Sequence, residues 1–247
     1  MKNNFGNNLP VINLYKKKSL KSPIDSQLLY GDNFKIIKKF SGWKKIKIKK
    51  DGYVGYIKNK KLHSPIKSNF KVSVVKARVY SKPNLKRKLN KFLPYESRLR
   101  IVKKSGKFGK FEKYWIKISD VKKINFKKKN IFKDVMLFKN TKYLWGGKSY
   151  KGIDCSALVQ IFFNHNNKFC PRDSKDQEKF FKKKVKIKNI KKNDMIFWKG
   201  HVAIVLSKNK LIHAYGPMKK VVIMDIKRTI ERIKRTANLQ ITSIRRN

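Results

Sequence analysis

The chain has 247 residues, 40% of them hydrophobic, which is enough apolar material to form buried cores and to divide into one to three small domains. This composition excludes a disordered chain, and two cysteines exclude a disulfide framework. The formal net charge of +52, from 66 Lys and Arg against 14 Asp and Glu, makes nucleic acid the first partner to consider.

The distribution of this charge argues against a nucleic-acid surface. Lysines recur between apolar residues throughout, as in IKKFSGWKKIKIKK, and arginine, which reads bases and phosphates with two donors, is scarce beside lysine. We interpret the enrichment in Lys, Asn, Ile and Phe as a coding bias that fills solvent positions, and we expect no nucleic-acid partner. A nucleic-acid surface and electrostatic attraction of an acidic substrate remain as alternatives.

The N-terminal sequence MKNNFGNNLPVINLY lacks the apolar run of a secretory signal, and no segment approaches the length of a membrane span. Cys155 and Cys170 lie so near each other in sequence that a disulfide between them would close little chain, which favours a reducing compartment. We therefore expect a cytoplasmic protein with no membrane span. Export by a route that ignores such signals stays open.

Residues 11–62 have the pattern of a small antiparallel barrel. Runs with period-2 alternation, FKIIKKF, WKKIKIK and YVGYI, are separated by Gly, Asp, Pro and Ser turn signals. The series NLY…S…LLYGD…V…GW…GYVGYI resembles bacterial SH3-like domains. We expect the first SH3-like domain over residues 1–65.

Residues 70–124 repeat this order of elements. The runs FKVSVVKARVYSKPN, LPYESRLRIVKKSGKFGKF and YWIKISDVKKI give a strand, a Pro turn, a strand, a Gly turn and an aromatic strand. They resemble the same SH3-like domains more weakly, and we expect a second barrel over residues 66–127. The alternative is that both stretches are β-rich segments of one larger sandwich.

The periodicity changes over residues 124–140, INFKKKNIFKDVMLFKN. Here Ile131, Val135 and Phe138 recur at helical spacing with lysines between them. This predicts a helix that leads into a glycine-rich loop, and a third domain over residues 128–247.

The segment YLWGGKSYKGIDCSALVQ, residues 143–160, places a cysteine directly behind that loop. Asp154 can cap a helix whose first turn holds Cys155 and Ser156, and the following ALVQIFF is apolar nearly all round, which predicts a buried helix. A cysteine at this position faces free amide groups and the positive end of the helix dipole, which lower the thiol pKa and can stabilise an oxyanion. Cys155 is therefore a candidate nucleophile.

Such a nucleophile needs an imidazole as general base and a group that orients the imidazole. The segment DMIFWKGHVAIVLSKNKLIHAYG predicts three strands that carry His201 and His213. With a three-residue loop, Ala203 pairs with His213, and His201 lies diagonally across on the same face at roughly 7–8 Å, where the two rings can touch. A two-residue loop would put the histidines on opposite faces.

The sequence gives weaker support for a metal site at the same residues. A zinc site of Cys155, His201 and His213 lacks a fourth close ligand and a C-x-x-C or H-x-x-x-H pair, so we expect no metal. His63 and His165 are interpreted as structural residues, and Cys170 as a packing or surface residue.

The motifs YLWGGKSYKGIDCSALVQ, PRDSKDQ, DMIFWKGHVAIVL and LIHA together resemble the NlpC-type cell-wall peptidases, a papain-like cysteine peptidase family, over the whole C-terminal domain. The resemblance implies an α+β fold with helices packed on an antiparallel sheet, preceded by two small all-β SH3-like barrels. It implies that Cys155 is the nucleophile, His201 its general base and His213 the orienting residue. The family usually has DCSG, where this chain has Ala157 in place of the last Gly, and we expect little effect from one added methyl group.

The two barrels, the lack of a signal peptide and the PRDS segment resemble the dipeptidyl-peptidase VI subgroup, the γ-D-glutamyl-L-diamino acid endopeptidases. The resemblance implies that Tyr143 helps with the oxyanion and the substrate wall. It also implies that six further residues contact the substrate or line the cleft: Trp145, Asp154, Ser156, Asp173, Ser174 and Gly200. From the first barrel, Asp32 and Tyr56 are expected contacts by analogous placement, with a role only in a turn as the alternative for Asp32.

The implied reaction is hydrolysis of the γ-D-glutamyl–diamino acid bond of murein peptides that have a free N-terminal L-Ala, in cell-wall peptide recycling and without a cofactor. A free amine is selected if buried acceptors would otherwise stay unpaired, and Asp154 and Ser156 can be two of them. Two alternatives remain: an endopeptidase acting on polymeric peptidoglycan after export, and a non-catalytic basic protein that binds wall fragments or nucleic acid.

Overall fold

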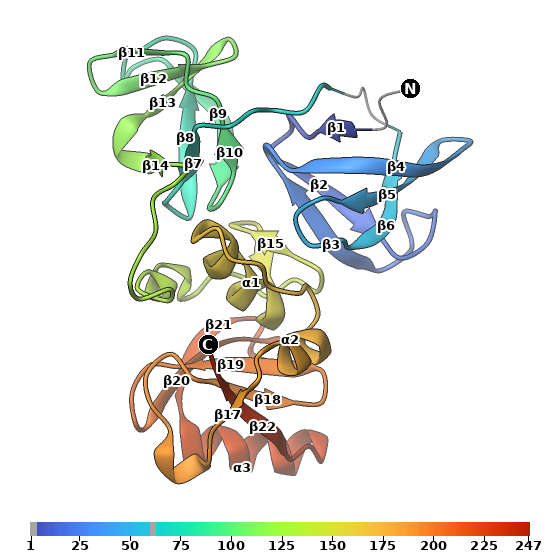
Figure 1. Ribbon diagram of the computed structural model, residues 1–247, viewed down its shortest axis with the longest axis vertical. Coiled ribbons are helices and arrows are strands. Elements are labelled where there is room, and N and C mark those ends of the chain that lie inside the picture. The colour runs from blue at the N-terminus through green and yellow to red at the C-terminus, as the bar shows by residue number, and fades with distance from the viewer. Residues whose placement is uncertain (1–3, 60–62) are drawn as a thin grey trace.

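The computed structural model describes residues 4–59 and 63–247, which form three units of secondary structure. Figure 1 shows two β units at one end of the molecule and a unit of helices and strands at the other. We name them the first unit (β1–β6), the second unit (β7–β14) and the third unit (from residue 124 onward). Domain boundaries at residues 65 and 127 stay a prediction.

The first unit is a six-stranded antiparallel sheet in the order β1-β4-β5-β6-β2-β3, closed around a small apolar core that includes Leu14, Leu28 and Phe34. The three alternating runs of the sequence coincide with β4, β5 and β6 to within a residue. The strands are β1 (Asn4–Gly6), β2 (Val11–Tyr15), β3 (Ile24–Leu29), β4 (Asn33–Phe40), β5 (Trp43–Ile48) and β6 (Val54–Lys58).

The second unit consists of a three-stranded sheet, β10-β7-β14, and a five-stranded sheet, β11-β12-β13-β8-β9, around their own apolar cluster. Its elements are β7 (Phe70–Val72), β8 (Lys76–Tyr80), β9 (Lys88–Pro94), β10 (Arg98–Leu99), β11 (Lys103–Ser105), β12 (Phe108–Phe111), β13 (Tyr114–Lys117), the 3₁₀ helix η1 (Ile118–Asp120) and β14 (Val121–Lys123).

The third unit is built on a six-stranded antiparallel sheet in the order β17-β22-β18-β19-β20-β21, with α1 on one face and α3 on the other (Figure 1). Its elements are η2 (Val135–Phe138), β15 (Lys148–Ser149), β16 (Gly152–Ile153), α1 (Cys155–His165), α2 (Ser174–Phe180), β17 (Lys183–Lys184), η3 (Ile187–Asn189), β18 (Met195–Trp198), β19 (His201–Val205), β20 (Lys210–Tyr215), η4 (Gly216–Met218), β21 (Lys220–Asp225), α3 (Ile226–Ala237) and β22 (Ile241–Arg246).

The prediction of a helix over residues 124–140 is wrong, because only the single turn η2 forms there. The apolar spacing still produces a buried face, since Ile131, Val135 and Phe138 all enter the core of the third unit. The side chain of Asn130 accepts a hydrogen bond from the Phe132 amide at 3.0 Å. This local side-chain bond competes with helical hydrogen bonding and favours a turn.

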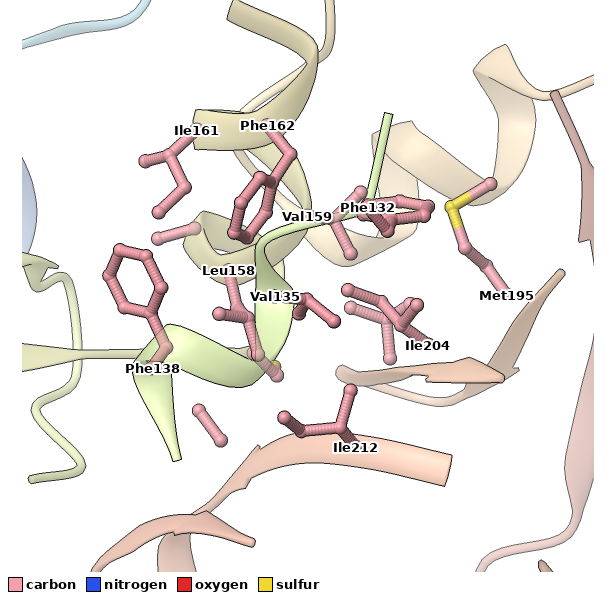
Figure 2. Close-up of a cluster of buried hydrophobic side chains, with 14 of the residues drawn as sticks. Phe132, Val135, Phe138, Leu158, Val159, Ile161, Phe162, Met195, Ile204 and Ile212 are labelled. Carbon is pink, nitrogen blue, oxygen red and sulfur yellow. The ribbon is translucent and has the colours of Figure 1, made fainter. Parts of the chain in front are cut away.

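The core of the third unit lies between α1 and the sheet. Figure 2 shows Leu158 and Phe162 of α1 facing Val135 and Phe138, with Ile212 of β20 on the sheet side. All eleven residues of α1 are buried, as its apolar sequence predicts. Packing along the whole of α1 therefore fixes the helix, and with it the position of the residues in its first turn.

The second unit caps the C-terminal end of α1 with two cations. The ammonium of Lys71 donates to the carbonyl of His165, and the guanidinium of Arg98 donates to the carbonyl of Asn164 at 3.0 Å. The last carbonyls of a helix have no intrahelical donors and carry its negative dipole end, so cations stabilise them.

A buried ion-pair network joins the first unit to the second. The ammonium of Lys50 contacts Asp32 at 2.6 Å and Glu96 at 2.8 Å, and Arg98 contacts the same Glu96 at 3.1 Å. The backbones meet at Gly31, where an added Cβ would lie 1.9 Å from the Arg98 carbonyl oxygen and where φ is +84°. Both the space and the backbone conformation therefore require glycine in the LLYGD motif.

We expect His165→Phe to keep or raise the free energy of unfolding and to weaken its dependence on pH. The ring of His165 is fully buried and stacks on Tyr95 with centroids 4.6 Å apart, while neither ring nitrogen has a hydrogen-bond partner among the described residues. Burial, with Lys71 nearby, lowers the pKa of His165 to about 3.

The unfolded histidine binds a proton below about pH 6.5, whereas the native one stays neutral until far lower pH, so this residue costs stability as the pH falls through that interval. The loss amounts to at most about 1.4 kcal/mol per pH unit. Urea unfolding of both proteins between pH 7 and pH 4 measures it. An identical pH dependence in the variant would contradict this account.

Candidate active site

The glycine-rich loop and Asp154 set the position of Cys155 at the first turn of α1. The Asp154 carboxylate accepts a hydrogen bond from the Ala157 amide at 2.8 Å and thus caps the helix, as the sequence predicts. The same carboxylate accepts from the Gly146 amide at 2.9 Å, which ties the loop to the helix. An added Cβ on Gly146 would lie 2.1 Å from the Ile24 carbonyl oxygen, so glycine lets the loop pack against β3 of the first unit.

Arg172 forms a buried, two-pronged ion pair with Asp154. Its terminal nitrogens donate to the two carboxylate oxygens at 3.0 and 2.6 Å, and also to the Ser156 hydroxyl at 2.9 Å. Its Nε donates to the Ser26 hydroxyl of β3 at 3.1 Å. This geometry is among the strongest for a charged pair, and it fastens the helix N-terminus to the first unit.

The two histidines meet because the β19–β20 hairpin has a three-residue loop. Ile204 pairs with Ile212 and Val205 with Leu211, a register that places Ala203 opposite His213. The rings of His201 and His213 lie 5.1 Å apart, with 2.9 Å between His201 Nε2 and His213 Nδ1. The structure therefore selects the first of the two loop lengths left open by the sequence.

The protonation of both rings follows from a methionine that the sequence analysis did not single out. His213 Nε2 lies 3.3 Å from the sulfur of Met224, which can only accept a hydrogen bond, so we assign the proton to Nε2. Burial lowers the pKa of His213 well below its ordinary value, which keeps this ring neutral and leaves Nδ1 as an acceptor. His201 must then donate through Nε2, and its own Nδ1 is free to accept a proton.

The thiol lies near the start of β19, before the pairing of β19 with β20 begins. By strand alternation His201 and His213 point to the α3 face of the sheet, whereas α1 packs on the opposite face. The paired register of β19 and β20 begins only at Ile204, and the free Val202 amide donates toward the Cys155 sulfur. The sulfur thus lies beside the residue that follows His201 in the chain.

The expectation of a low thiol pKa is wrong for this resting geometry. Burial, reinforced by the Asp154 carboxylate, raises the pKa of Cys155 to about 12, and the amides of Val202 and Ser156 offset only part of this. Burial lowers the pKa of His201 to about 4. Both groups are therefore neutral at pH 7 in this structure.

A cavity of about 360 Å³ opens in front of Cys155 between the first and third units. It contains the nucleophile candidate and six of the predicted cleft residues: Trp145, Asp154, Ser156, Asp173, Ser174 and Gly200. Five further lining residues were not predicted: Lys16, Asp25, Tyr53, Arg172 and Lys175. We name this the first cavity.

The residues proposed for the first unit need correction. Asp32 and Tyr56 do not line the first cavity. Asp32 is buried in the ion-pair network with Lys50 and accepts from the Leu29 amide at 2.8 Å, which is the turn role considered as the alternative. Tyr56 packs against Phe40 on another surface of the barrel. Asp25 and Tyr53 occupy the cavity wall instead.

Asp154 and Ser156 lie at the cavity but are not free acceptors. The Asp154 carboxylate already receives donors from Gly146, Ala157, Ser156 and Arg172. The Ser156 hydroxyl donates to Asp154 and accepts from Arg172. Their role is therefore to hold the nucleophile's loop and helix in place.

A cavity of about 490 Å³, the second cavity, opens on the His201 side. Gly200, in the tight β18–β19 turn with φ +78°, borders both cavities. The lining residues are Tyr143, Lys199, Gly200, His201, Tyr215, Gly216, Pro217, Arg232, Ile233, Thr236, Ala237 and Leu239.

Burial and the nearby Cys155 raise the pKa of Tyr143. Its phenol therefore keeps its proton, which it can donate in a hydrogen bond to an oxyanion.

The geometry does not suit the competing zinc site. The facing nitrogens of His201 and His213 bond to each other instead of pointing at a common centre with Cys155. Within residues 4–59 and 63–247, no cluster of three or more His, Cys, Asp or Glu side chains has a metal-binding arrangement.

No helix in this described part of the chain is long and apolar enough to cross a membrane.

Comparisons with known proteins give matches for two parts of the sequence and for the whole fold. The NlpC/P60 family matches residues 140–237, and the bacterial dipeptidyl-peptidase SH3 domain matches residues 14–62. The crystal structure of an NlpC/P60 family protein from Bacillus cereus ATCC 10987 superposes with a TM-score of 0.84 at 18% identity, covering 98% of this chain and 99% of that one.

Two relatives are similar in sequence. Dipeptidyl-peptidase 6 of Lysinibacillus sphaericus is 36% identical over 87 residues, which are 35% of this chain and 32% of that protein. Gamma-D-glutamyl-L-lysine dipeptidyl-peptidase of Bacillus subtilis (strain 168) is 26% identical over 232 residues, which are 84% of this chain and 77% of that protein. The match to the first of these thus spans about a third of its length.

The fold is that of a papain-like cysteine peptidase preceded by β units, as the sequence predicts. The C-terminal part of the chain is an NlpC/P60 domain, of a cysteine peptidase family, and it follows a bacterial dipeptidyl-peptidase SH3 domain. The assignment of a second SH3-like barrel to residues 66–127 stays a prediction.

We expect alkylation of Cys155 by iodoacetamide to accelerate steadily from pH 6 to pH 10 without a plateau. Only the thiolate reacts, and the raised pKa keeps its population small throughout this range. Mass spectrometry of the modified protein gives the rate, and Cys155→Ala is the control because Cys170 is fully buried. A rate already maximal below pH 7 would show that a thiolate is present at rest.

Proposed function

We propose that this protein is a cysteine peptidase that hydrolyses the γ-D-glutamyl–diamino acid bond of short murein peptides with a free N-terminal L-Ala. The observation that carries the proposal is the composition of the first cavity, where the Cys155 thiol is combined with acidic and basic side chains from two units. A short zwitterionic peptide has the matching charges.

Two carboxylates of the first cavity fit an ammonium group. Burial raises the pKa of both Asp25 and Asp173, which means that neither negative charge is fully compensated by neighbouring cations. Tyr53 donates a long hydrogen bond of 3.4 Å to Asp173 and so holds the two units together at the wall. Asp25 is half-buried and Asp173 is exposed, so an acylated amine would lose a charge-assisted hydrogen bond to these carboxylates, which favours a free N-terminus.

The cations of the cavity fit the other charge of the substrate. A γ-linked D-glutamate keeps its α-carboxylate free, and Cα, Cβ and Cγ separate this carboxylate from the carbonyl carbon of the bond that is cut. Lys16 and Lys175 line the cavity, and the guanidinium of Arg172 borders it. The dipeptide L-Ala-γ-D-Glu therefore has a complementary partner for each of its charges, within a volume of about 360 Å³ that is small for a ligand cavity.

The reaction starts with both catalytic groups neutral. His201 Nδ1 takes the thiol proton as the Cys155 sulfur attacks the γ-carbonyl carbon, and the carbonyl oxygen becomes an oxyanion. Amide groups at the N-terminus of α1 and the Tyr143 phenol are the donors for that oxyanion. The imidazolium that forms is stabilised by the chain of hydrogen bonds through His213 to Met224.

Collapse of the tetrahedral intermediate breaks the C–N bond. The imidazolium of His201 gives its proton to the leaving nitrogen, so the diamino acid departs as a neutral amine and a thioester remains on Cys155. Water then attacks the thioester with His201 as base, which releases L-Ala-D-Glu and restores the thiol. No cofactor takes part in these steps.

A role in recycling cell-wall peptides in the cytoplasm belongs to the same proposal. The first unit contributes Lys16, Asp25 and Tyr53 to the wall of the cavity, and a wall on this side favours short free peptides over a polymeric strand. The two buried free cysteines suit a reducing compartment. An endopeptidase on polymeric peptidoglycan remains the second candidate, distinguished by activity on peptides with a blocked N-terminus.

We expect Cys155→Ala to abolish turnover of the tripeptide L-Ala-γ-D-Glu-L-Lys and Cys170→Ala to retain it, because only Cys155 lines the cavity. Release of L-Ala-D-Glu, followed by liquid chromatography, measures turnover. The N-acetylated tripeptide should not be cleaved by the wild-type protein. Cleavage of the blocked peptide at a comparable rate would refute the requirement for a free amine, and full activity of Cys155→Ala would refute the nucleophile.

We expect Asp25→Asn to raise KM for the free tripeptide roughly 10- to 100-fold with little change in kcat, because a charge-assisted hydrogen bond to the ammonium contributes roughly 1.5–3 kcal/mol. Asp176→Asn is the matched control, since this exposed aspartate of α2 does not line the cavity. Steady-state kinetics of the two variants side by side provide the test. An unchanged KM in Asp25→Asn would remove the first unit from amine recognition.

A further inference from the structure

We infer that Tyr215 is a positioning residue of the reaction, because the face of its ring holds His213 in the plane that lets His201 act as the base. This inference rests on the proposed function and adds one residue to its machinery. The sequence analysis predicts no role for Tyr215, which directly follows the LIHA motif.

A histidine that orients another histidine must itself be oriented. A carboxylate in this place can only accept hydrogen bonds, whereas a neutral imidazole accepts through one nitrogen and donates through the other. Among the described residues, no Asp or Glu side chain forms a hydrogen bond or an ion pair with His201 or His213. The action of the base therefore depends on how the His213 ring is placed.

The plane of the His213 ring decides whether both of its nitrogens are bonded. The lone pair on Nδ1 and the N–H bond at Nε2 both lie in that plane. The plane must therefore contain Nε2 of His201, at 2.9 Å, and the sulfur of Met224, at 3.3 Å. A tilt of the ring weakens both contacts. Because a thioether is a weak acceptor, Met224 alone holds the ring only loosely.

Tyr215 fixes this plane by stacking. It lies two residues after His213 in β20, so the two side chains leave the same face of the strand about 7 Å apart. Their ring centroids are nevertheless only 4.7 Å apart, and the ring planes differ by 9°, which means that the rings lean together into a parallel stack. His213 is fully buried and Tyr215 is 6% exposed, so neighbouring side chains confine the stack.

The stack also suits the charge that arises during the reaction. When His201 takes the thiol proton, its positive charge polarises the hydrogen bond to His213 and the ring that faces Tyr215. The face of an aromatic ring is negative and attracts this charge. The contact is therefore stronger in the transition state than in the resting enzyme, and its loss should lower kcat.

We expect Tyr215→Leu to lower kcat for L-Ala-γ-D-Glu-L-Lys roughly 2- to 13-fold with little change in KM. The lost stack contributes about 0.5–1.5 kcal/mol, and 1.36 kcal/mol corresponds to a factor of ten. The conservative variant Tyr215→Phe keeps the stacking face and should restore kcat. A higher KM at unchanged kcat would make Tyr215 a wall of the cavity only, and equal losses in both variants would exclude the ring face as the acting group. Either result overturns the inference.

NMR of the histidine rings through two-bond ¹H–¹⁵N couplings gives a readout that does not depend on turnover. In the wild-type protein we expect His213 to carry its proton on Nε2 and none on Nδ1. In Tyr215→Leu the two nitrogen signals should move toward each other, because weaker contacts populate the second tautomer, and Tyr215→Phe should match the wild type. Ile233→Ala is the matched control, since it removes apolar surface from the same cavity lining but no ring, and it should keep the wild-type signals.

The outcomes separate this inference from the proposed function. A proton on Nδ1 of His213 in the wild-type protein would overturn the inference, and this measurement stands even where Tyr215→Leu does not fold. A Tyr215→Leu spectrum identical to that of the wild type would overturn it as well. Absence of turnover in the wild-type protein, with the spectra as expected, would overturn the proposed function and not the hold of Tyr215 on His213.

Discussion

The buried ion pair between Arg172 and Asp154 is the interaction on which the site depends. Its carboxylate caps α1 through Ala157 and holds the glycine loop through Gly146, and its guanidinium reaches Ser26 of the first unit. Removing either partner would leave a charge buried without compensation, which typically costs 3–5 kcal/mol, about a third or more of the stability of an ordinary domain. This one ion pair thus fixes the N-terminus of α1, the glycine-rich loop and the neighbouring wall of the first unit.

Helix α1 is held at both ends by different units. The first unit contacts the loop before its N-terminus, where the Gln27 side chain accepts from the Lys148 amide at 2.8 Å. The second unit supplies Lys71 and Arg98 to its C-terminal carbonyls. The two β units are in turn joined through Lys50. This closed ring of contacts explains why a small cavity can be formed from parts that are far apart in the sequence.

The sequence was sufficient for most strands and for the capped helix, because these follow from periodicity and from local hydrogen bonding, but it left the β19–β20 loop length, and with it the histidine pairing, open. It was not sufficient for contacts between units. Asp32 follows Gly31 and Asp25 lies two residues after Pro23, and only docking decides that Asp32 is buried with Lys50 and that Asp25 lines the first cavity. Arg172 stood within the PRDS motif and could have been suspected as an arginine in a lysine-rich chain. The thiol pKa was misjudged because the dipole of a helix can be seen in a sequence, whereas the depth of burial cannot.

The protonated state of the Cys155 thiol also bears on chemical durability. Peroxide attacks thiolates, and the sulfenic acid that forms is the first step toward irreversible oxidation. A cysteine that is 7% exposed and carries a neutral thiol offers little of the reactive form to an oxidant. The burial that keeps the Cys155 thiol protonated therefore also slows its oxidation by peroxide.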